Sequence, residues 1–308
     1  MVLEKSGILI VDKPAGMTSA RVVAWLKKNA GYRKVGHAGT LDPLATGILV
    51  CCVNQATRLA RFFLHGSKKY QGTLMLGTET DTFDATGDVT ATCDVTGLSE
   101  EKIKSVFCRF EGEMDQLPPV YSALKHNGVP LYRLAREGKP VQKPSRRVHI
   151  SSLRVLKIDL PLIHFEVSCS AGTYIRTICS DIGKELGCGG HLKSLRRTES
   201  CGFSEDHAIT MEEVENLLAE GRLSEKMIDM SEAIEDMKGY VADQELTDKV
   251  LYGQPITGRI LENKRIQSGK KDRYRKFIRI VDPENNLLAV MGNEKNSDVY
   301  DYCCVFHP

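Results

Sequence analysis

The chain has 308 residues, of which 42% are hydrophobic and 27% are charged, and its net charge at pH 7 is +2. This composition excludes a disordered protein, and no apolar run approaches the ~20 residues that would cross a bilayer. The first residues show no signal or transit pattern, and the ten cysteines form no Cys-x-x-Cys pair. We therefore expect a cytoplasmic protein with reduced, structural cysteines.

The first part of the chain alternates strands and helices. Apolar runs predict buried strands at residues 7–11, 48–53 and 70–76. Thr18 or Ser19 is typical of a helix start, and this helix would run to about Asn29. Ser99 caps a second predicted helix, whose apolar residues share one face: Ile103, Val106, Phe107 and Phe110.

Residues 117–147 break this pattern with prolines, glycines and many basic side chains, and Glu137 is their one acid. So polar an excursion is tolerated at a surface, and long excursions in compact domains tend to be functional. The alternative is a mobile loop whose charges are simply solvated.

The chain then returns to regular elements. Residues 148–158 and 162–169 predict a hairpin around Leu160-Pro161, and residues 173–186 predict a helix ended by Gly187. The sequence Thr210-Met-Glu-Glu213 is a capping box that predicts one more helix.

The chain changes character near Gly239, where we place a domain boundary. The remaining residues predict one helix at 243–252 and short strands at 277–281 and 287–291, which indicates a small, mostly β module. Charge is also uneven here. Residues 205–236 carry eleven acidic side chains against two basic ones, whereas residues 264–279 carry eight basic against one acidic. A basic patch of this kind is the footprint of a polyanion site.

Residues 36–47 read Gly-His-Ala-Gly-Thr-Leu-Asp-Pro-Leu-Ala-Thr-Gly. Glycines allow a backbone to approach a ligand closely, His37 could stack or move protons, and Asp42 could act as nucleophile or general base. The same residues permit a structural interpretation, because Asp42 followed by Pro43 is also typical of a helix N-terminus. Taken alone, the segment leaves both interpretations open.

Metal binding has little support in the sequence. Cys188-Gly-Gly-His191, with Cys179 and Cys201 nearby, could be drawn as a zinc site but lacks paired ligands at regular spacing. Residues 80–84 could suggest calcium but lack the EF-hand spacing. There is also no phosphate-binding loop or dinucleotide fingerprint, so we expect neither a metal nor a cofactor.

Seven ordered motifs together resemble one family. They are Asp12-Lys-Pro-Ala-Gly-Met-Thr-Ser19, residues 36–47, Lys69-Tyr70, Thr80-Asp-Thr-Phe-Asp84, Gln116-Leu-Pro-Pro-Val-Tyr-Ser-Ala123, Gly172-Thr-Tyr-Ile-Arg176 and Leu195-Arg-Arg197. This series, spanning residues 7–202, is similar to the TruB family of tRNA pseudouridine synthases, and the tail resembles a PUA RNA-binding module. Thr-Leu-Asp at Asp42, where other pseudouridine synthase families usually carry Arg-Leu-Asp, favours TruB.

The resemblance implies a mixed α/β (α+β) fold: a catalytic domain at residues 1–236 around an antiparallel-rich central sheet, with a basic thumb insertion at about 117–147. A PUA-like domain would occupy residues 239–308. The implied activity is isomerisation of uridine 55 in the T loop of tRNA, without metal or cofactor, by a monomer that needs no protein partner and no membrane. Two alternatives remain: an RNA-binding or RNA-folding protein without turnover, and a guide-dependent synthase.

The resemblance also assigns roles to residues. Asp42 would attack C1′ or remove a proton at C2′, and a neighbouring Arg176 would keep it ionised by lowering its pKa. Tyr70 would lie on the uracil and receive a proton late in the reaction, Leu195 would line the opposite side, and His37 would fill the stack left by the flipped base. Two more residues are assigned to substrate binding: Tyr174, and Lys13, which with Pro14 would pack behind the catalytic loop.

Phosphate contacts are expected from the two basic segments, and affinity should therefore fall with salt. From the thumb insertion and its end, the candidates are Lys125, Arg133, Arg136, Arg146 and Arg147. From the tail, they are Lys270 and Arg273.

Overall fold

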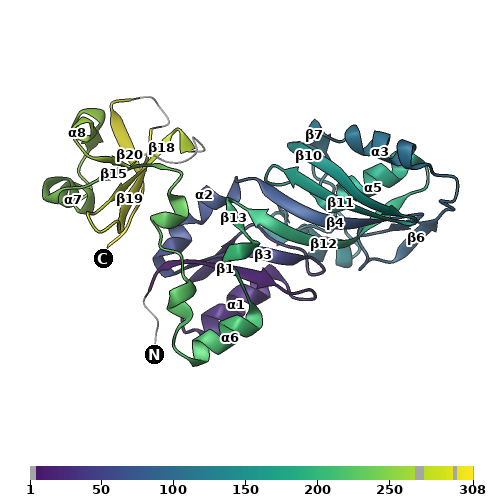
Figure 1. Ribbon diagram of the computed structural model, residues 1–308, viewed down its shortest axis with the longest axis horizontal. Coiled ribbons are helices and arrows are strands. Elements are labelled where there is room, and N and C mark those ends of the chain that lie inside the picture. The colour runs from purple at the N-terminus through teal and green to yellow at the C-terminus, as the bar shows by residue number, and fades with distance from the viewer. Residues whose placement is uncertain (1–4, 268–273, 294–296, 308) are drawn as a thin grey trace.

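Two β-sheets form the framework of the protein, which we describe from a computed structural model over residues 5–267, 274–293 and 297–307. A ten-stranded sheet has the order β14-β1-β3-β12-β4-β11-β10-β7, with β2 paired to β3 and β13 paired to β12 (Figure 1). A separate six-stranded sheet has the order β16-β20-β19-β18-β15-β17. No helix in the described part of the chain is long and apolar enough to cross a membrane.

Most neighbours in the large sheet are antiparallel, and only β1–β14 and β12–β3 are parallel. The expectation of an antiparallel-rich central sheet is therefore confirmed. Its strands are β1 (Gly7–Lys13), β2 (Val35–Ala38), β3 (Thr46–Val53), β4 (Lys68–Leu76), β7 (Gly112–Gln116), β10 (Arg146–Asp159), β11 (Leu162–Cys169), β12 (Gly190–Ser200), β13 (Phe203–Ser204) and β14 (Ala208–Thr210).

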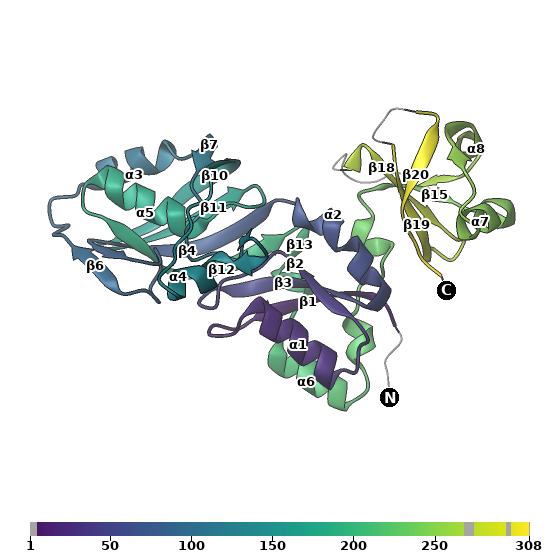
Figure 2. The same ribbon diagram turned by 180° about the vertical axis from the view of Figure 1, so that it is seen from behind.

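Two pairs of helices cover this sheet, and each begins where the local sequence predicts. Thr18 caps α1 (Ser19–Asn29), Ser99 caps α3 (Glu100–Cys108), and Thr210 forms the capping box of α6 (Met211–Ala219). The fourth helix, α5 (Ile175–Leu186), ends at Gly187 in the left-handed conformation. Helices α3 and α5 pack on β4, β10 and β11, whereas α1 and α6 pack on β1 and β3 (Figures 1 and 2).

The glycine-rich segment 36–47 is a strand followed by a loop, not a helix start. Strand β2 ends at Ala38, residues 39–45 form an irregular turn, and β3 begins at Thr46. The helix interpretation of Asp42 is therefore wrong. Gly47 has φ +96°, and a Cβ there would lie 2.3 Å from the carbonyl oxygen of Arg197, so only glycine fits where β3 and β12 meet.

The basic excursion after Gln116 has short regular elements of its own. These are β8 (Lys125–His126), β9 (Val129–Pro130) and α4 (Leu131–Arg136), which in Figure 2 lie in front of the middle of the large sheet. Another short hairpin, β5 (Thr78–Thr80) with β6 (Val89–Thr92), extends from the end of β4.

Short helical turns lie between strands of the large sheet: η1 (Asn54–Leu59) and α2 (Ala60–Leu64) between β3 and β4, and η2 (Glu205–His207) between β13 and β14. Two more, η3 (Leu223–Lys226) and η4 (Glu232–Ile234), lead from α6 to the second sheet. The six-stranded sheet contains β15 (Lys238–Val241), β16 (Ile256–Thr257), β17 (Ile266–Gln267), β18 (Phe277–Val281), β19 (Leu287–Gly292) and β20 (Val299–Val305). Its helices are α7 (Gln244–Leu251), capped by Asp243, and α8 (Gly258–Glu262). The predicted tail helix and strands are confirmed to within about two residues at their ends.

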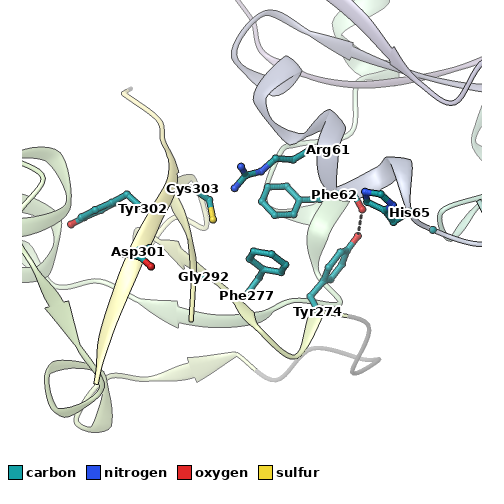
Figure 3. Close-up of a pocket in the computed structure, with 10 residues that line it drawn as sticks. Arg61, Phe62, His65, Tyr274, Phe277, Gly292, Asp301, Tyr302 and Cys303 are labelled. Atoms are coloured by element: carbon teal, nitrogen blue, oxygen red, sulfur yellow. Dashed lines mark hydrogen bonds between the residues drawn. The ribbon is translucent and has the colours of Figure 1, made fainter. Parts of the chain in front are cut away.

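The junction between the sheets is a shared apolar core. Residues of β1, β3 and α2 cluster with Val281, Leu287 and Phe306 of the second sheet. The Phe62 ring of α2 meets Phe277 edge to face at 5.2 Å, and the Tyr274 hydroxyl donates to the Phe62 carbonyl at 3.2 Å (Figure 3). A hollow of about 500 Å³ opens beside these rings. The second sheet is therefore packed firmly against the first.

The basic run at residues 264–279 does not form one exposed patch. Arg279 lies on a central strand, is 5% exposed, and donates to the carbonyls of Met237 and Ser231. Lys264 forms an ion pair with Asp243. The expectation that this whole run grips phosphate is therefore wrong for Arg279, because a buried arginine is not available to RNA.

Candidate active site

A pocket of about 370 Å³ brings together side chains that are far apart in the sequence. Asp42 comes from the glycine-rich loop, Tyr70 from β4, Tyr174 and Arg176 from the start of α5, and Leu195 from β12. The wall toward the thumb insertion is formed by Ala123 and Leu124. With Arg146, six of the residues expected from the sequence thus line one cavity.

Asp42 and Arg176 form an ion pair at the centre of the pocket. The Nε of Arg176 lies 2.8 Å from Oδ2 of Asp42, and its Nη2 donates to Oδ1 at 3.3 Å. Arg176 is buried, whereas a third of the Asp42 side chain is exposed. The guanidinium also donates to the carbonyls of Thr82 at 3.0 Å and Tyr121 at 2.9 Å. The arginine is therefore fixed in place, and the aspartate remains open to a ligand.

The electrostatic effect on Asp42 differs from the expectation. Burial raises the pKa of the Asp42 carboxyl above its ordinary value, and the Arg176 guanidinium opposes this rise without reversing it. The expected net lowering of the pKa is thus wrong, because loss of water around the carboxylate outweighs the ion pair. A carboxylate with a raised pKa is a stronger base, which suits proton removal as well as attack on carbon.

Asp84 is a residue of this site whose role the sequence analysis missed. It is buried, and its Oδ2 lies 3.5 Å from Nη1 of Arg176, so the arginine stands between two carboxylates. Its Oδ1 accepts from the Thr82 hydroxyl at 2.9 Å and from the Thr86 amide and hydroxyl at 2.9 and 2.6 Å. The motif ending in Asp84 was the available signal: it was counted toward the family resemblance and weighed as a calcium loop, but Asp84 was given no role in the site.

Tyr70 and Leu195 occupy the adjacent strands β4 and β12 and are each 8% exposed. Burial raises the pKa of the Tyr70 hydroxyl, with Arg197 opposing. Arg197, directly opposite Tyr70 in register, is 1% exposed and donates to the carbonyls of Ile48 at 2.7 Å and Gly39 at 3.1 Å. It therefore ties the glycine-rich loop to the strands that carry the pocket.

Lys13 braces the loop from behind and does not reach the pocket. Its side chain is fully buried, and its Nζ donates to the carbonyls of Pro14 at 2.8 Å, Met17 at 2.7 Å and Pro43 at 3.3 Å. Burial lowers the pKa of Lys13 to about 8, with Asp42 opposing. All three donors thus face carbonyls, which agrees with packing behind the loop, and substrate contact by Lys13 stays a prediction.

His37 lies on β2, outside the residues that line the pocket. Its Nδ1 is buried and has no hydrogen-bond partner in the described part of the chain. Burial lowers the pKa of His37, and the positive charge of Arg197 adds to this effect. The imidazole is therefore neutral at pH 7. Its insertion into RNA stays a prediction.

The expected phosphate contacts have different surroundings. Lys125, Arg133 and Arg136 are exposed on the thumb insertion. Arg147 is also exposed, but it pairs with Glu113 at 3.0 Å and Asp115 at 3.4 Å. Arg146 lines the pocket itself. Lys270 and Arg273 lie outside the described residues.

Metal coordination has no visible basis in the described ranges. Within residues 5–267, 274–293 and 297–307, no three His, Cys, Asp or Glu side chains gather as metal ligands would. The pocket itself presents a paired carboxylate, a phenol and an apolar wall.

Solved structures and family models define the class of this protein. The crystal structure of a Cbf5-Nop10-Gar1 complex is similar over 98% of this chain and 85% of that chain, with a TM-score of 0.74 and 27% identity. The structure of an H/ACA RNP bound to a substrate RNA containing 2′-deoxyuridine is similar over 98% of this chain and 85% of that chain, with a TM-score of 0.72 and 25% identity. The model of the TruB family pseudouridylate synthase N-terminal domain matches residues 27–175. The fold is that of a pseudouridine synthase.

Curated relatives narrow the class to one family. The model of the tRNA pseudouridylate synthase B C-terminal domain matches residues 176–242. The tRNA pseudouridine synthase B of Syntrophotalea carbinolica is 46% identical over 82% of each chain, and that of Clostridium acetobutylicum is 40% identical over 84% of this chain and 88% of the relative. The chain belongs to the TruB family of pseudouridine synthases. The expected mixed α/β fold with a C-terminal β domain is confirmed as well.

Proposed function

We propose that the protein converts uridine 55 in the T loop of tRNA to pseudouridine, acting in the cytoplasm as a monomer without a protein or guide RNA partner. The observation that carries this proposal is Asp42, a partly exposed carboxylate held by a buried arginine in a pocket with Tyr70 and Leu195. The relatives named tRNA pseudouridine synthase B support tRNA as the substrate. The motif resemblance supports position 55.

The reaction is an isomerisation, so nothing is oxidised and no group is lost. The bond between N1 of uracil and C1′ breaks, the base turns, and a bond forms between C5 and C1′, while C5 gives up a proton and N1 gains one. Asp42 starts the reaction by attack at C1′ or by removal of the C2′ proton. Tyr70 and Leu195 hold the uracil on its two sides, where base–aromatic stacking contributes roughly 1–3 kcal/mol.

The base must leave the RNA stack to reach this pocket. Tyr70 and Leu195 are each 8% exposed, so a stacked base could not reach them. Flipping costs a few kcal/mol of stacking and pairing. The neutral ring of His37, five residues before Asp42, fills the vacated space in the loop and offsets part of that cost.

The thumb insertion and the second sheet add to the protein surface that contacts RNA. Lys125, Arg133 and Arg136 are exposed and face no recorded acidic partner in the described part of the chain, so they contact phosphates and make binding salt-dependent. We assign the catalytic domain to residues 1–236, with the thumb at about 117–147, and a PUA-like RNA-binding domain to residues 239–308.

Tritium release tests the proposal. Purified protein alone is mixed with a T-arm hairpin whose uridine 55 carries tritium at C5, and a second hairpin carries the label at another loop uridine. We expect release from the first hairpin only, loss of release in Asp42→Asn with RNA binding retained, and full activity in the control Asp159→Asn, which changes an exposed carboxylate paired with Lys157. Binding without release by the wild-type protein would instead support an RNA-binding protein without turnover.

A further inference from the structure

An arginine on the wall of the catalytic pocket is not used by the chemistry described above. Arg146 begins β10, and its guanidinium lies over the ring of Tyr174, with Cζ 4.5 Å from the ring centroid. Its Nε is buried, and within the described residues this atom has no hydrogen-bond partner. The next residue, Arg147, points to the other face of the strand and pairs with two surface acids.

The platform beneath Arg146 is fixed by buried contacts. Gln116 on β7 is the register partner of Arg146 and is 1% exposed. Its amide donates to the Tyr174 carbonyl at 3.0 Å and accepts from the Tyr174 backbone at 2.7 Å. Gly172 completes the platform, because a Cβ at this position would lie 3.2 Å from Cζ of Arg146. The guanidinium therefore has a fixed place in the pocket wall.

The charges of the pocket indicate what Arg146 is placed to bind. Arg176 is held by Asp42 and two carbonyls, and Arg197 is held by two carbonyls. Arg146, by contrast, faces no carboxylate at ion-pair distance in the described part of the chain. The Arg146 side chain is half-buried on the pocket wall, and its buried Nε has no partner among the described residues, so an anionic ligand in the pocket is the natural partner. In a uridine nucleotide the uracil and ribose are neutral, and the only anion is the phosphodiester.

We propose that Arg146, stacked on Tyr174, binds the phosphodiester attached to the target uridine and thereby positions the flipped nucleotide over Asp42. The planar guanidinium matches two phosphate oxygens at once. It also offsets the repulsion between the phosphate and the nearby Asp42 carboxylate. Arg146 is a positioning residue in this role, and the proposal rests on the proposed function.

The first test compares two arginines in single-turnover tritium release with the labelled T-arm hairpin. A charge-assisted contact in the pocket predicts that Arg146→Ala lowers the apparent second-order rate by about 10- to 100-fold. The control Arg109→Ala, which removes an exposed ion pair with Glu185, should stay within about twofold of wild type. Arg146→Lys should recover part of the loss. Equal rates in Arg146→Ala and Arg109→Ala would overturn the proposal.

The second test changes the RNA, and its first measurement uses the wild-type protein alone. Hairpins carry a neutral methylphosphonate at the linkage 5′ or 3′ of the target uridine. At one of these linkages, the modification should slow the wild-type protein as much as the Arg146→Ala substitution slows the reaction on unmodified RNA. The same modification should cause no further loss of rate in Arg146→Ala. Independent losses at both linkages would refute the contact. If wild type releases no tritium from the unmodified hairpin, the proposed function itself fails, which is a different result.

Discussion

Removing Arg176 should show how much its ion pairs with Asp42 and Asp84 contribute to the free energy of unfolding. In Arg176→Met, Asp84 stays buried without its cation and Asp42 loses both contacts. Breaking a buried ion pair by removing one partner costs about 3–5 kcal/mol. Because a third of Asp42 is exposed and Asp84 keeps three donors, we expect the lower end, roughly 3 kcal/mol. That is a large part of a typical domain stability of about 5–15 kcal/mol.

Urea denaturation of Arg176→Met and wild type at pH 7 and pH 5 measures this effect. Without the arginine, burial and the Asp84 charge raise the pKa of Asp42 and only the smaller effect of Lys13 opposes them, so the folded variant binds protons more readily than the unfolded chain does. Its free energy of unfolding must then fall as pH rises, and the destabilisation should be smaller at pH 5. Adding Asp84→Asn should restore part of the stability. A loss below about 1 kcal/mol, or one that is the same at both pH values, would refute the reasoning.

Three further predictions concern Asp42 and Gly47 in the glycine-rich segment 36–47, and Lys13 behind it. Because burial raises the pKa of Asp42 and the reaction needs its ionised form, the single-turnover rate should begin to fall with acidification above the ordinary Asp value of about 3.9; a profile flat down to that value would contradict this. Burial lowers the pKa of Lys13 from 10.5 to about 8, so the unfolded chain binds more protons above pH 8. Between pH 8 and 9.5 the free energy of unfolding of wild type should therefore rise by roughly 1.5 kcal/mol relative to Lys13→Met, and urea denaturation showing no such divergence would argue against the buried charge. Gly47→Ala should lose at least about 2 kcal/mol in thermal denaturation, because its Cβ would strike the Arg197 backbone, whereas Gly16→Ala, also at positive φ but with open space, should lose less; equal losses would assign the effect to backbone strain alone.

The elements that were predicted well are those whose signals are local. Thr18, Ser99 and Thr210 cap their own helices through backbone amides three residues away, so the sequence contains both partners. The hairpin at Leu160-Pro161 and the helix ended by Gly187 depend on equally local features. By contrast, the order of strands in the large sheet joins residues more than a hundred positions apart, and no local pattern specifies it.

The parts of the site that the sequence missed are non-local pairings. Asp84 reaches Arg176 only because the β5–β6 segment, α5 and the glycine-rich loop meet at one place. The motif at residues 80–84 marks Asp84 as part of the resemblance, but no local pattern there indicates that Asp84 pairs with Arg176. The motif resemblance identified Asp42, Tyr70 and Leu195 as residues of one site. The direction in which the pKa of Asp42 shifts, however, depends on how deeply the carboxyl is buried, and only the folded chain defines that burial.

Five arginines show why a count of basic residues cannot locate an RNA contact. Arg279 and Arg197 are buried and use their donors on backbone carbonyls, Arg176 is paired with Asp42, and Arg147 is paired on the surface. Each of these side chains already has its partner. Arg146 carries the same charge, but its position on Tyr174 fixes the guanidinium while leaving its anion to come from outside. The distribution of partners, which follows from strand register and burial, therefore decides which positive charge is available to the substrate.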